Sequence, residues 1–398
     1  MDLAGKKIVL GLTGGVACYK AAMLARELGR TGATVHVVMT EAATHFMTAV
    51  TMQALTGNPV YTDQWDARMD NNMPHINLTR DADAVVIVPC STDFIAKLAH
   101  GHCDDLLSTL CVARPARVPL MVAPAMNVEM WQNPATQRNV RQIRDDGILL
   151  LGPDAGAQAC GEVGEGRMLE PAQLLEEIVA AFQPKLLAGR RVLLTAGPTF
   201  EPIDPVRGIT NLSSGKMGYA IARAAREAGA EVTLVSGPTA LETPYGVQRV
   251  DVQTALQMHE AVLAHVKEKD LFVAVAAVAD WRVANASEQK LKKQDENDTP
   301  QLEFVQNPDI LATVAALPQR PYCVGFAAES ENLEQYGAAK RIRKNIPLLV
   351  GNIGHQTFGR DDNALMLFDA QGHSALPRAD KQTLARQLVR EIARRMAA

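Results

Sequence analysis

The sequence predicts an α/β protein made of two Rossmann-like or flavodoxin-like parallel-sheet domains in series. A chain of 398 residues is too long for one average domain. Short apolar strands alternate with amphipathic helices, which is typical of βαβ units whose parallel sheets are covered on both faces. The same succession of segments occurs twice along the chain, so we expect one such sheet in each half.

The expected elements of the two halves correspond in order. Each half should begin with a basic pair, a strand and a glycine turn, followed by a helix, a Gly-Ala break and a second strand. Two further apolar strands should follow. The matching segments are 6–15 with 190–199, 24–40 with 221–237, 81–91 with 269–280, and 117–127 with 345–354.

The domain boundary is expected within 182–191, where Pro184 and Gly189 interrupt helix signals. This predicts domains at 1–188 and 189–398. The C-terminal segment 378–398 is predicted to form an amphipathic closing helix. Residues 287–301 are charged and lack apolar periodicity, so we expect a loop that is either functional or disordered.

Composition excludes several classes of protein. The net charge of −4 gives no footprint for bulk nucleic-acid binding. None of the six cysteines forms a C-x-x-C pair, which argues against a zinc ribbon or a thioredoxin motif. No segment is typical of a signal peptide or a membrane span. We therefore expect a cytoplasmic protein with reduced thiols and without membrane or nucleic-acid partners.

The segment "GITNLSSGKMG", Gly208 to Gly218, looks like a phosphate loop but departs from the P-loop pattern. Six residues separate Gly208 from Gly215, where a P-loop has four. Met217 stands where the magnesium-binding Ser or Thr should be. The pattern favours nucleotide binding by something other than a P-loop ATPase.

Ligands of open α/β sheets bind at the carboxyl ends of the strands, so the residues after each strand are the candidates. Gly14 and Gly15 at the first turn could bring a phosphate to a helix N-terminus. Because G-x-G-x-x-G is absent, a mononucleotide such as FMN fits better than a dinucleotide. A plain tight turn is the alternative.

Three further residues stand out in the first half. The amide of Asn127, at a strand end, could hold a carboxylate or a carbonyl. Cys160 lies in the glycine-rich segment 156–168, which could be a lid with a reactive thiol or a flexible linker. His75 follows a proline in a polar loop, where a solvated histidine is the common alternative.

Several motifs carry a resemblance to known families. "GLTGGVACYK", "MPHINL", "APAMNVEMW" and "ACGEVGEGRM" resemble the homo-oligomeric flavin-containing cysteine decarboxylases. "AGPTFEPIDPVRGITNLSSGKMG", "AAVADW", "KLKK" and "NPDI" resemble phosphopantothenate–cysteine ligases. The combination, over nearly the whole chain, is similar to the bacterial bifunctional phosphopantothenoylcysteine decarboxylase/phosphopantothenate–cysteine ligases of coenzyme A synthesis.

For the first half, the resemblance implies that FMN oxidises the cysteine side chain to a thioaldehyde. CO₂ is then lost and the flavin returns the hydride. His75 would be the base, Asn127 would hold the substrate carboxylate, and Cys160 would donate the last proton from a lid. The family binds FMN between the subunits of a trimer, and bifunctional members form larger homo-oligomers in which we expect dimeric ligase domains. The implied FMN contacts are Gly14, Gly15, Thr40, Ser91, Thr92 and Ser108.

For the second half, the resemblance implies that 4′-phosphopantothenate attacks the α-phosphate of CTP and that cysteine then displaces CMP. Asn211 would help to form or use the acyl-cytidylate, although it could also be a helix N-cap. Lys290 would close on the triphosphate from a flap, with a solvated charge run as the alternative. Asp280 would bind the ribose or Mg²⁺. The implied CTP contacts are Ser213, Ser214, Ala276, Asp280, Lys290, Asn307, Asp309, Phe326, Lys340 and Lys344, the last two sharing a helix face.

The chain departs from the family pattern at three positions. Gln306 stands where Lys is frequent, Ile353 where Asp is frequent, and Cys18 where a small residue is usual. Three other functions would fit parts of the chain. A peptide-cysteine decarboxylase would not need the ligase half, a flavodoxin-like electron carrier would not need Cys160, and a nicotinamide dehydrogenase should have G-x-G-x-x-G.

Overall fold

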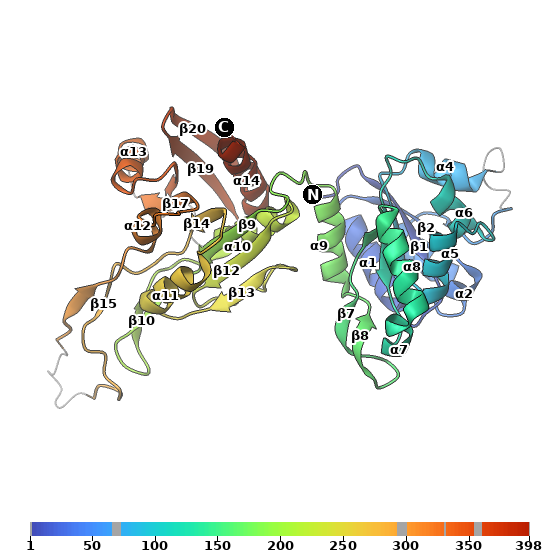
Figure 1. The fold of residues 1–398 in the computed structure, drawn as a ribbon, viewed down its shortest axis with the longest axis horizontal. Coiled ribbons are helices and arrows are strands. Elements are labelled where there is room, and N and C mark those ends of the chain that lie inside the picture. Colours follow the sequence, from blue (N-terminus) through green and yellow to red (C-terminus); the bar gives the residue numbers. More distant parts are fainter. Residues whose placement is uncertain (1, 66–72, 293–300, 330–331, 354–359, 398) are drawn as a thin grey trace. The chain divides into compact units, whose positions relative to one another are not determined.

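The structure is a computed structural model that describes residues 2–65, 73–292, 301–329, 332–353 and 360–397. The chain divides into two compact units, Met1–Phe182 and Gln183–Ala398 (Figure 1). The division falls a few residues before the predicted boundary at 188. The physical reason is that Leu187 is buried and its amide donates a hydrogen bond to the Ala228 carbonyl, at 2.9 Å, within the second unit.

The first unit alternates strands and helices as predicted. Its elements are β1 (Lys7–Leu12), α1 (Cys18–Arg30), β2 (Thr34–Met39), α2 (Glu41–Thr44), α3 (Ala49–Thr56), β3 (Val60–Tyr61), α4 (Pro74–Arg80), β4 (Ala84–Cys90), α5 (Thr92–His100), α6 (Leu106–Ala113), β5 (Leu120–Pro124), α7 (Val128–Gln132), α8 (Pro134–Asp145), β6 (Leu149–Leu150), β7 (Asp154–Ala157), β8 (Val163–Arg167) and α9 (Pro171–Ala181).

The six-stranded sheet of this unit has the order β3-β2-β1-β4-β5-β6, with every pair parallel. All residues of β4 are buried, as expected for a strand covered on both faces. The strand order reverses between β1 and β4. In doubly wound sheets, this switch point opens the crevice that binds a ligand.

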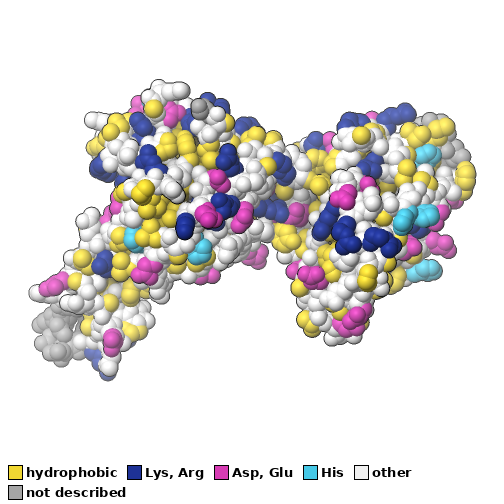
Figure 2. Space-filling view, in the orientation of Figure 1, with side chains coloured by type: hydrophobic (Ala, Val, Ile, Leu, Met, Phe, Trp, Pro, Cys, Tyr) yellow, Lys and Arg dark blue, Asp and Glu magenta, His cyan; other side chains and the backbone are white. Residues whose placement is uncertain are grey.

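Helices cover both faces of this sheet. On one face α5, α6 and α8 pack on a core that includes Val85 and Ile87. The other face carries α1, which contacts α3 and α9. α8 is amphipathic, because Val140 and Ile143 are buried while its arginines project outward and form part of the basic surface over this helix (Figure 2).

The second unit has a larger sheet and more irregular connections. Its elements are β9 (Arg191–Ala196), β10 (Phe200–Pro202), β11 (Gly208–Thr210), α10 (Lys216–Glu227), β12 (Glu231–Ser236), β13 (Gln248–Asp251), α11 (Ala255–His265), β14 (Leu271–Ala274), β15 (Trp281–Val283), β16 (Phe304–Gln306), α12 (Ile310–Ala315), β17 (Tyr322–Glu329), α13 (Leu333–Arg343), β18 (Leu348–Ile353), β19 (Asp362–Asp369), β20 (Gly372–Asp380) and α14 (Lys381–Ala397).

The eight-stranded sheet has the order β13-β12-β9-β14-β17-β18-β19-β20. Its first six strands are parallel, whereas β19 and β20 add an antiparallel edge that the sequence did not predict. The predicted closing helix begins at Lys381 rather than at residue 378, because the preceding residues pair with β19. The sheet is covered on both faces: Val192 and Leu194 of β9 pack towards α10 and α14, and Leu193 packs towards α11 and α12.

Within the described residues, three two-stranded ribbons accompany the two sheets, and the sequence predicted none of them. They are β7–β8 in the first unit and β10–β11 and β15–β16 in the second. Of the predicted loop 287–301, residues 293–300 lie outside the described residues. Across the ranges that the structure describes, no helix combines the length and the apolar character that a membrane span requires.

Candidate active sites

The first unit has a cavity of about 450 Å³ at the carboxyl ends of β1, β4 and β5. It lies at the switch point of the strand order, where the sequence placed the ligand. The predicted site residues that line it are Gly14, Gly15, Ser91, Thr92, Asn127 and Cys160.

The turn after β1 is held rigidly beside this cavity. The Thr13 hydroxyl donates to the Pro89 carbonyl at 2.8 Å and accepts the Ser91 amide at 2.9 Å. α1 begins without a side-chain cap, and the Cys18 and Lys20 amides donate to the Gly15 and Ala17 carbonyls. An anion in the cavity would therefore be attracted mainly by the positive end of the helix dipole. Cys18 fits this packed turn as a small buried thiol whose Sγ donates to the Thr13 carbonyl, and burial raises the pKa of Cys18 to about 11.

Asn127 and Cys160 meet at one carboxylate. Asn127 caps α7 through Oδ1, which accepts the Met130 amide at 3.0 Å, and its Nδ2 donates to Oε2 of Glu162 at 3.1 Å. The Cys160 thiol donates to the same Oε2 at 3.5 Å. The β7–β8 hairpin, which carries Cys160 and Glu162, therefore lies over the strand end that carries Asn127.

A buried lysine ties the base of this hairpin to α1. The side chain of Lys20 is 7% exposed and donates to Glu170 at 2.8 Å and to the Met168 carbonyl at 3.1 Å. Hydrogen bonds from Lys20 and then Arg167 hold the pKa of Glu170 below its ordinary value, against a smaller opposing effect of burial. Lys20 and Arg167 also line the cavity, so the network links the helix N-terminus to the hairpin.

Three predicted residues of the first unit lie off this cavity. His75 is in the first turn of α4 and is not among the lining residues. Thr40 caps α2, with its hydroxyl accepting the Ala43 amide. Ser108 is buried in the capping box of α6, where its hydroxyl pairs with Asp105. Thr40 and Ser108 thus serve helix ends, and one chain alone does not bring His75 to the cavity.

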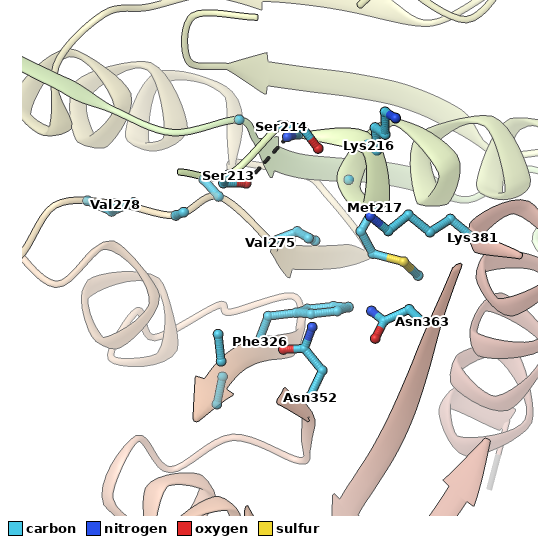
Figure 3. A pocket seen from close by; sticks show the side chains of 17 residues that line it. Ser213, Ser214, Lys216, Met217, Val275, Val278, Phe326, Asn352, Asn363 and Lys381 are labelled. Carbon is cyan, nitrogen blue, oxygen red and sulfur yellow. Dashed lines mark hydrogen bonds between the residues drawn. The ribbon is translucent and has the colours of Figure 1, made fainter. Parts of the chain in front are cut away.

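The second unit has a cavity of about 180 Å³ at the start of α10 (Figure 3). Ser213 and Ser214 reach it from the loop before the helix, and Phe326 and Asn352 reach it from β17 and β18. Lys381 lies at its edge. Burial and then the charge of Lys216 lower the pKa of Lys381, whose ammonium donates to the Arg360 carbonyl, while Lys216 pairs with Asp361 at 2.5 Å.

The segment "GITNLSSGKMG" folds as strand β11, a loop and the first turn of α10. The N-cap of α10 is Gly215, with φ of 75°, so the reading of Asn211 as the helix cap is wrong. Asn211 instead donates from Nδ2 to the Ala277 carbonyl at 2.8 Å. Because glycine has no side chain, Gly215 does not cap the first amides of α10. Such amides at a helix N-terminus are suited to bind an anion.

A second cavity of about 220 Å³ adjoins the first, and the two share Ala276, Val278 and Phe326. The other predicted nucleotide contacts that line it are Asp280, Asn307, Asp309, Lys340 and Lys344. The sequence placed these residues in one site, and the structure brings them together.

Inside this second cavity, Asn307 is buried and supports the backbone: its Nδ2 donates to the Ala279 carbonyl at 2.9 Å. Asp309 caps α12 and also pairs with Lys344. Burial acts to raise the pKa of Asp309, but the hydrogen bond from Lys344 and the Ala312 amide outweigh it and hold that pKa below its ordinary value. Gln306, the departure from the family's lysine, lines the same cavity.

Lys290 is exposed and lies outside both cavities. Its neighbour Leu291 is anchored, since the Leu291 amide donates to Asp204 at 3.2 Å and its carbonyl accepts from Arg207 at 2.9 Å. The hydrogen bonds of Arg207 hold the pKa of Asp204 well below its ordinary value. The anchor fixes the base of the predicted flap. The departure at Ile353 falls on the last residue of β18.

Metal-ligating side chains are sparse: within the described part of the chain, no three His, Cys, Asp or Glu residues cluster as a metal site would require. Asp280, the predicted Mg²⁺ ligand, is exposed at the rim of the second cavity. A magnesium ion here would need the oxygens of a bound triphosphate, which is the usual way that proteins hold this ion.

The sequence missed several residues of both sites. Glu162 carried a signal, since a carboxylate two residues after a candidate acid is a natural partner. Asn363 and Lys381 carried no such signal. Asn363 stands in the unpredicted strand β19, and Lys381 is the first residue of the closing helix α14.

Comparisons with known proteins agree with this arrangement. The Flavoprotein family matches residues 1–183, and the family of the DNA/pantothenate metabolism flavoprotein C-terminal domain matches residues 187–396. The chain is 51% identical over 388 residues to the coenzyme A biosynthesis bifunctional protein CoaBC of Vibrio cholerae, covering 96% of this chain and 97% of that protein.

Two solved structures are also similar. The C-terminal domain of a coenzyme A biosynthesis bifunctional protein CoaBC is 39% identical, with a TM-score of 0.46, over 54% of this chain and 98% of that one. The FMN binding protein AtHal3 is 33% identical, with a TM-score of 0.41, over 44% of this chain and 96% of that one. The chain belongs to the family of bifunctional coenzyme A biosynthesis proteins, in which a flavoprotein decarboxylase domain precedes a phosphopantothenate–cysteine ligase domain.

Proposed function

We propose that the second unit joins cysteine to 4′-phosphopantothenate with CTP, through an acyl-cytidylate, releasing CMP and pyrophosphate. The first unit then decarboxylates the 4′-phosphopantothenoylcysteine with FMN and yields 4′-phosphopantetheine, both reactions taking place in the cytoplasm. The observation that carries the proposal is that each unit has a cavity at the carboxyl ends of its strands, lined by residues that the family resemblance assigns. In this proposal 1–188 is the decarboxylase domain and 189–398 the ligase domain.

The first cavity fits FMN. Its volume of about 450 Å³ lies within the range of cofactor sites. The uncapped start of α1 beside Gly14 and Gly15 suits the phosphate, and Ser91 and Thr92 line the same cavity. FMN, when bound, supplies the acceptor and donor of the hydride, while the protein supplies position.

The chain's own residues would then bind the substrate and move a proton. The Asn127 amide would hold the carboxylate that leaves as CO₂. After CO₂ has left, the Cys160 thiol would donate its proton to the carbon of the enethiolate, which forms one C–H bond and a C=S group and leaves a Cys160 thiolate. The returned hydride would then add to the C=S carbon and give the product thiolate, which takes a proton from water. Cys160 is exposed on the hairpin, so the Cys160 thiolate can regain a proton from water.

A second copy of the chain would complete this site. His75, the proposed base, lies off the cavity of its own chain, so we propose that a neighbouring copy in a trimer supplies it. Val16, Tyr19 and Met23 support this, because these apolar side chains near the start of α1 are 54–61% exposed. Such exposed apolar groups commonly mark a protein interface.

The ligase unit would bind CTP across its two adjoining cavities. Asp280, Lys340 and Lys344 would bind the nucleotide in one, and the start of α10 with Ser213 and Ser214 would bind an anionic group in the other. Asp280 would help to hold Mg²⁺, which would neutralise charge on the triphosphate.

Three further proposals concern the surroundings of the CTP site. Lys290 would close over the triphosphate from its anchored base. Asn211, hydrogen-bonded to Ala277, would stabilise the acyl-cytidylate. Trp281 and Phe304, which are 60% and 56% exposed on the β15–β16 ribbon, suit a dimer contact between ligase units.

The test is incubation of the purified chain with 4′-phosphopantothenate, cysteine, Mg²⁺ and either CTP or ATP, with all products followed by mass. We expect CMP, pyrophosphate and 4′-phosphopantetheine with CTP and little product with ATP, because a site built around one base edge leaves its polar groups unpaired with another. Release of orthophosphate from ATP during ligation would contradict the acyl-cytidylate route.

A further inference from the structure

The β7–β8 hairpin is fastened to the segment after β5 at several points. Gln158 accepts the Val128 amide at 3.0 Å, Glu165 accepts the Trp131 indole N–H at 3.1 Å, and the Met126 amide donates to Gly166 at 3.0 Å. These contacts hold the hairpin in place independently of Glu162. Glu162 is therefore free to exchange partners without release of the hairpin.

The orientation of the Asn127 amide is fixed by its helix. Its Oδ1 accepts the Met130 amide at the N-cap of α7, so Nδ2 must face the hairpin and can only donate. The group that it meets there is the carboxylate of Glu162, at 3.1 Å. An amide donor that the proposed function assigns to the substrate carboxylate thus holds a carboxylate of the chain itself.

We propose that Glu162 is an internal substitute for the substrate carboxylate, an inference that rests on the proposed decarboxylase function. When substrate binds, its carboxylate takes the Asn127 amide and Glu162 keeps its second partner, the Cys160 thiol at 3.5 Å. When CO₂ leaves, the Asn127 amide is vacated and Glu162 returns to it. Glu162 is a positioning residue. It competes with the substrate carboxylate for the Asn127 amide and does not compete with the product, which has lost its carboxylate.

Two variants of Glu162 grade this competition. Glu162→Gln keeps an acceptor for Asn127 but loses the charge, which weakens the hydrogen bond. Glu162→Ala removes the acceptor. The matched control is Glu165→Gln, because Glu165 fastens the same hairpin through Trp131 and, among the described residues, forms no hydrogen bond with Asn127 or Cys160.

The experiment uses the full-length, FMN-loaded chain supplied with phosphopantothenoylcysteine. We expect KM to fall by about two- to fivefold in Glu162→Ala, the size expected for one partly exposed charged contact, with Glu162→Gln intermediate. The dissociation constant of 4′-phosphopantetheine, measured by calorimetry, should not change in either variant. In Glu165→Gln, any change should affect substrate and product alike.

Two results would overturn the inference: an unchanged or raised KM in Glu162→Ala, or an equal shift in the affinity for product, which would make Glu162 a shaping residue of the hairpin. The proposed function fails in a different way. If the wild-type chain releases no CO₂ from phosphopantothenoylcysteine, both the function and this inference are wrong, whatever the variants do.

Discussion

Two helical glycines should respond in opposite ways to the same substitution. Gly218 lies in the first turn of α10 against β9, and a Cβ added there would stand 2.5 Å from the Cβ of Ala196 and 3.2 Å from its Cα. The first distance is about 0.9 Å short of the 3.4 Å at which ordinary contact begins, and the obstacle is a central strand that cannot yield cheaply. Gly29, in the last turn of α1, has no atom within 4 Å of such a Cβ.

We expect Gly218→Ala to destabilise the second unit by about 1–3 kcal/mol, because overpacking outweighs the gain in helix propensity. Gly29→Ala should stabilise the first unit by about 0.5 kcal/mol through the lower entropy of the unfolded chain. Pulse proteolysis in urea can measure each unit separately through its own fragment. Since α10 also begins the proposed anion site, ligation by Gly218→Ala should slow by about tenfold or more while decarboxylation is preserved. Equal or greater stability of Gly218→Ala would refute the close packing of α10 on β9.

Three further predictions concern the two sites. Cys160→Ser should still bind FMN and release CO₂ but accumulate an oxidised, decarboxylated product by mass; a normal yield of 4′-phosphopantetheine would remove Cys160 from the reaction. Lys290→Gln and Asn211→Asp should impair ligation and leave decarboxylation of supplied substrate intact, and equal loss of both activities would argue for misfolding instead. Because the pKa of Asp309 is lowered in the folded state, its contribution to stability is present above the unfolded value, near 3.8, and disappears as the pH falls through the folded value. Asp309→Asn, which keeps a good helix cap, should thus destabilise the second unit at pH 7 and progressively less below pH 4, as urea midpoints would show; an equal loss at pH 7 and pH 2 would contradict the ionic role.

The parallel cores of both units could be predicted because their strands are uniformly apolar and buried on both faces. β4 and β9 illustrate this, since every residue of β4 is buried and successive residues of β9 face opposite helical layers. The antiparallel edge β19–β20 could not be predicted in the same way. β20 is mostly exposed, so its sequence lacks the apolar signal that marks a buried strand.

The sites were predictable where a residue follows a strand and not where it depends on a second element. Asn127 lies at the carboxyl end of β5, so topology alone placed it in the cavity. Glu162 reaches Asn127 only because the β7–β8 hairpin folds back over the end of β5. The pairing of β7 with β8 could not be predicted, because the glycine-rich segment 156–168 is equally compatible with a flexible linker. His75 shows the same limit, since its proposed partners belong to another copy of the chain.

The segment "GITNLSSGKMG" departs from the P-loop pattern because the two domains connect their first strand to the next long helix in different ways. In the first unit β1 ends at Leu12 and α1 begins at Cys18, so the strand-to-helix turn itself forms the floor of the cavity. In the second, β9 ends at Ala196 and α10 begins only at Lys216, because the β10–β11 ribbon is inserted between them. The residues that lead into the N-terminus of α10 therefore come from the end of the β10–β11 ribbon, after Thr210, and not directly from β9. The spacing before Gly215 is therefore set by the path of the chain from the β10–β11 ribbon to α10 rather than by a loop that wraps a phosphate. This is why a helix start without a side-chain cap can be present without the P-loop pattern.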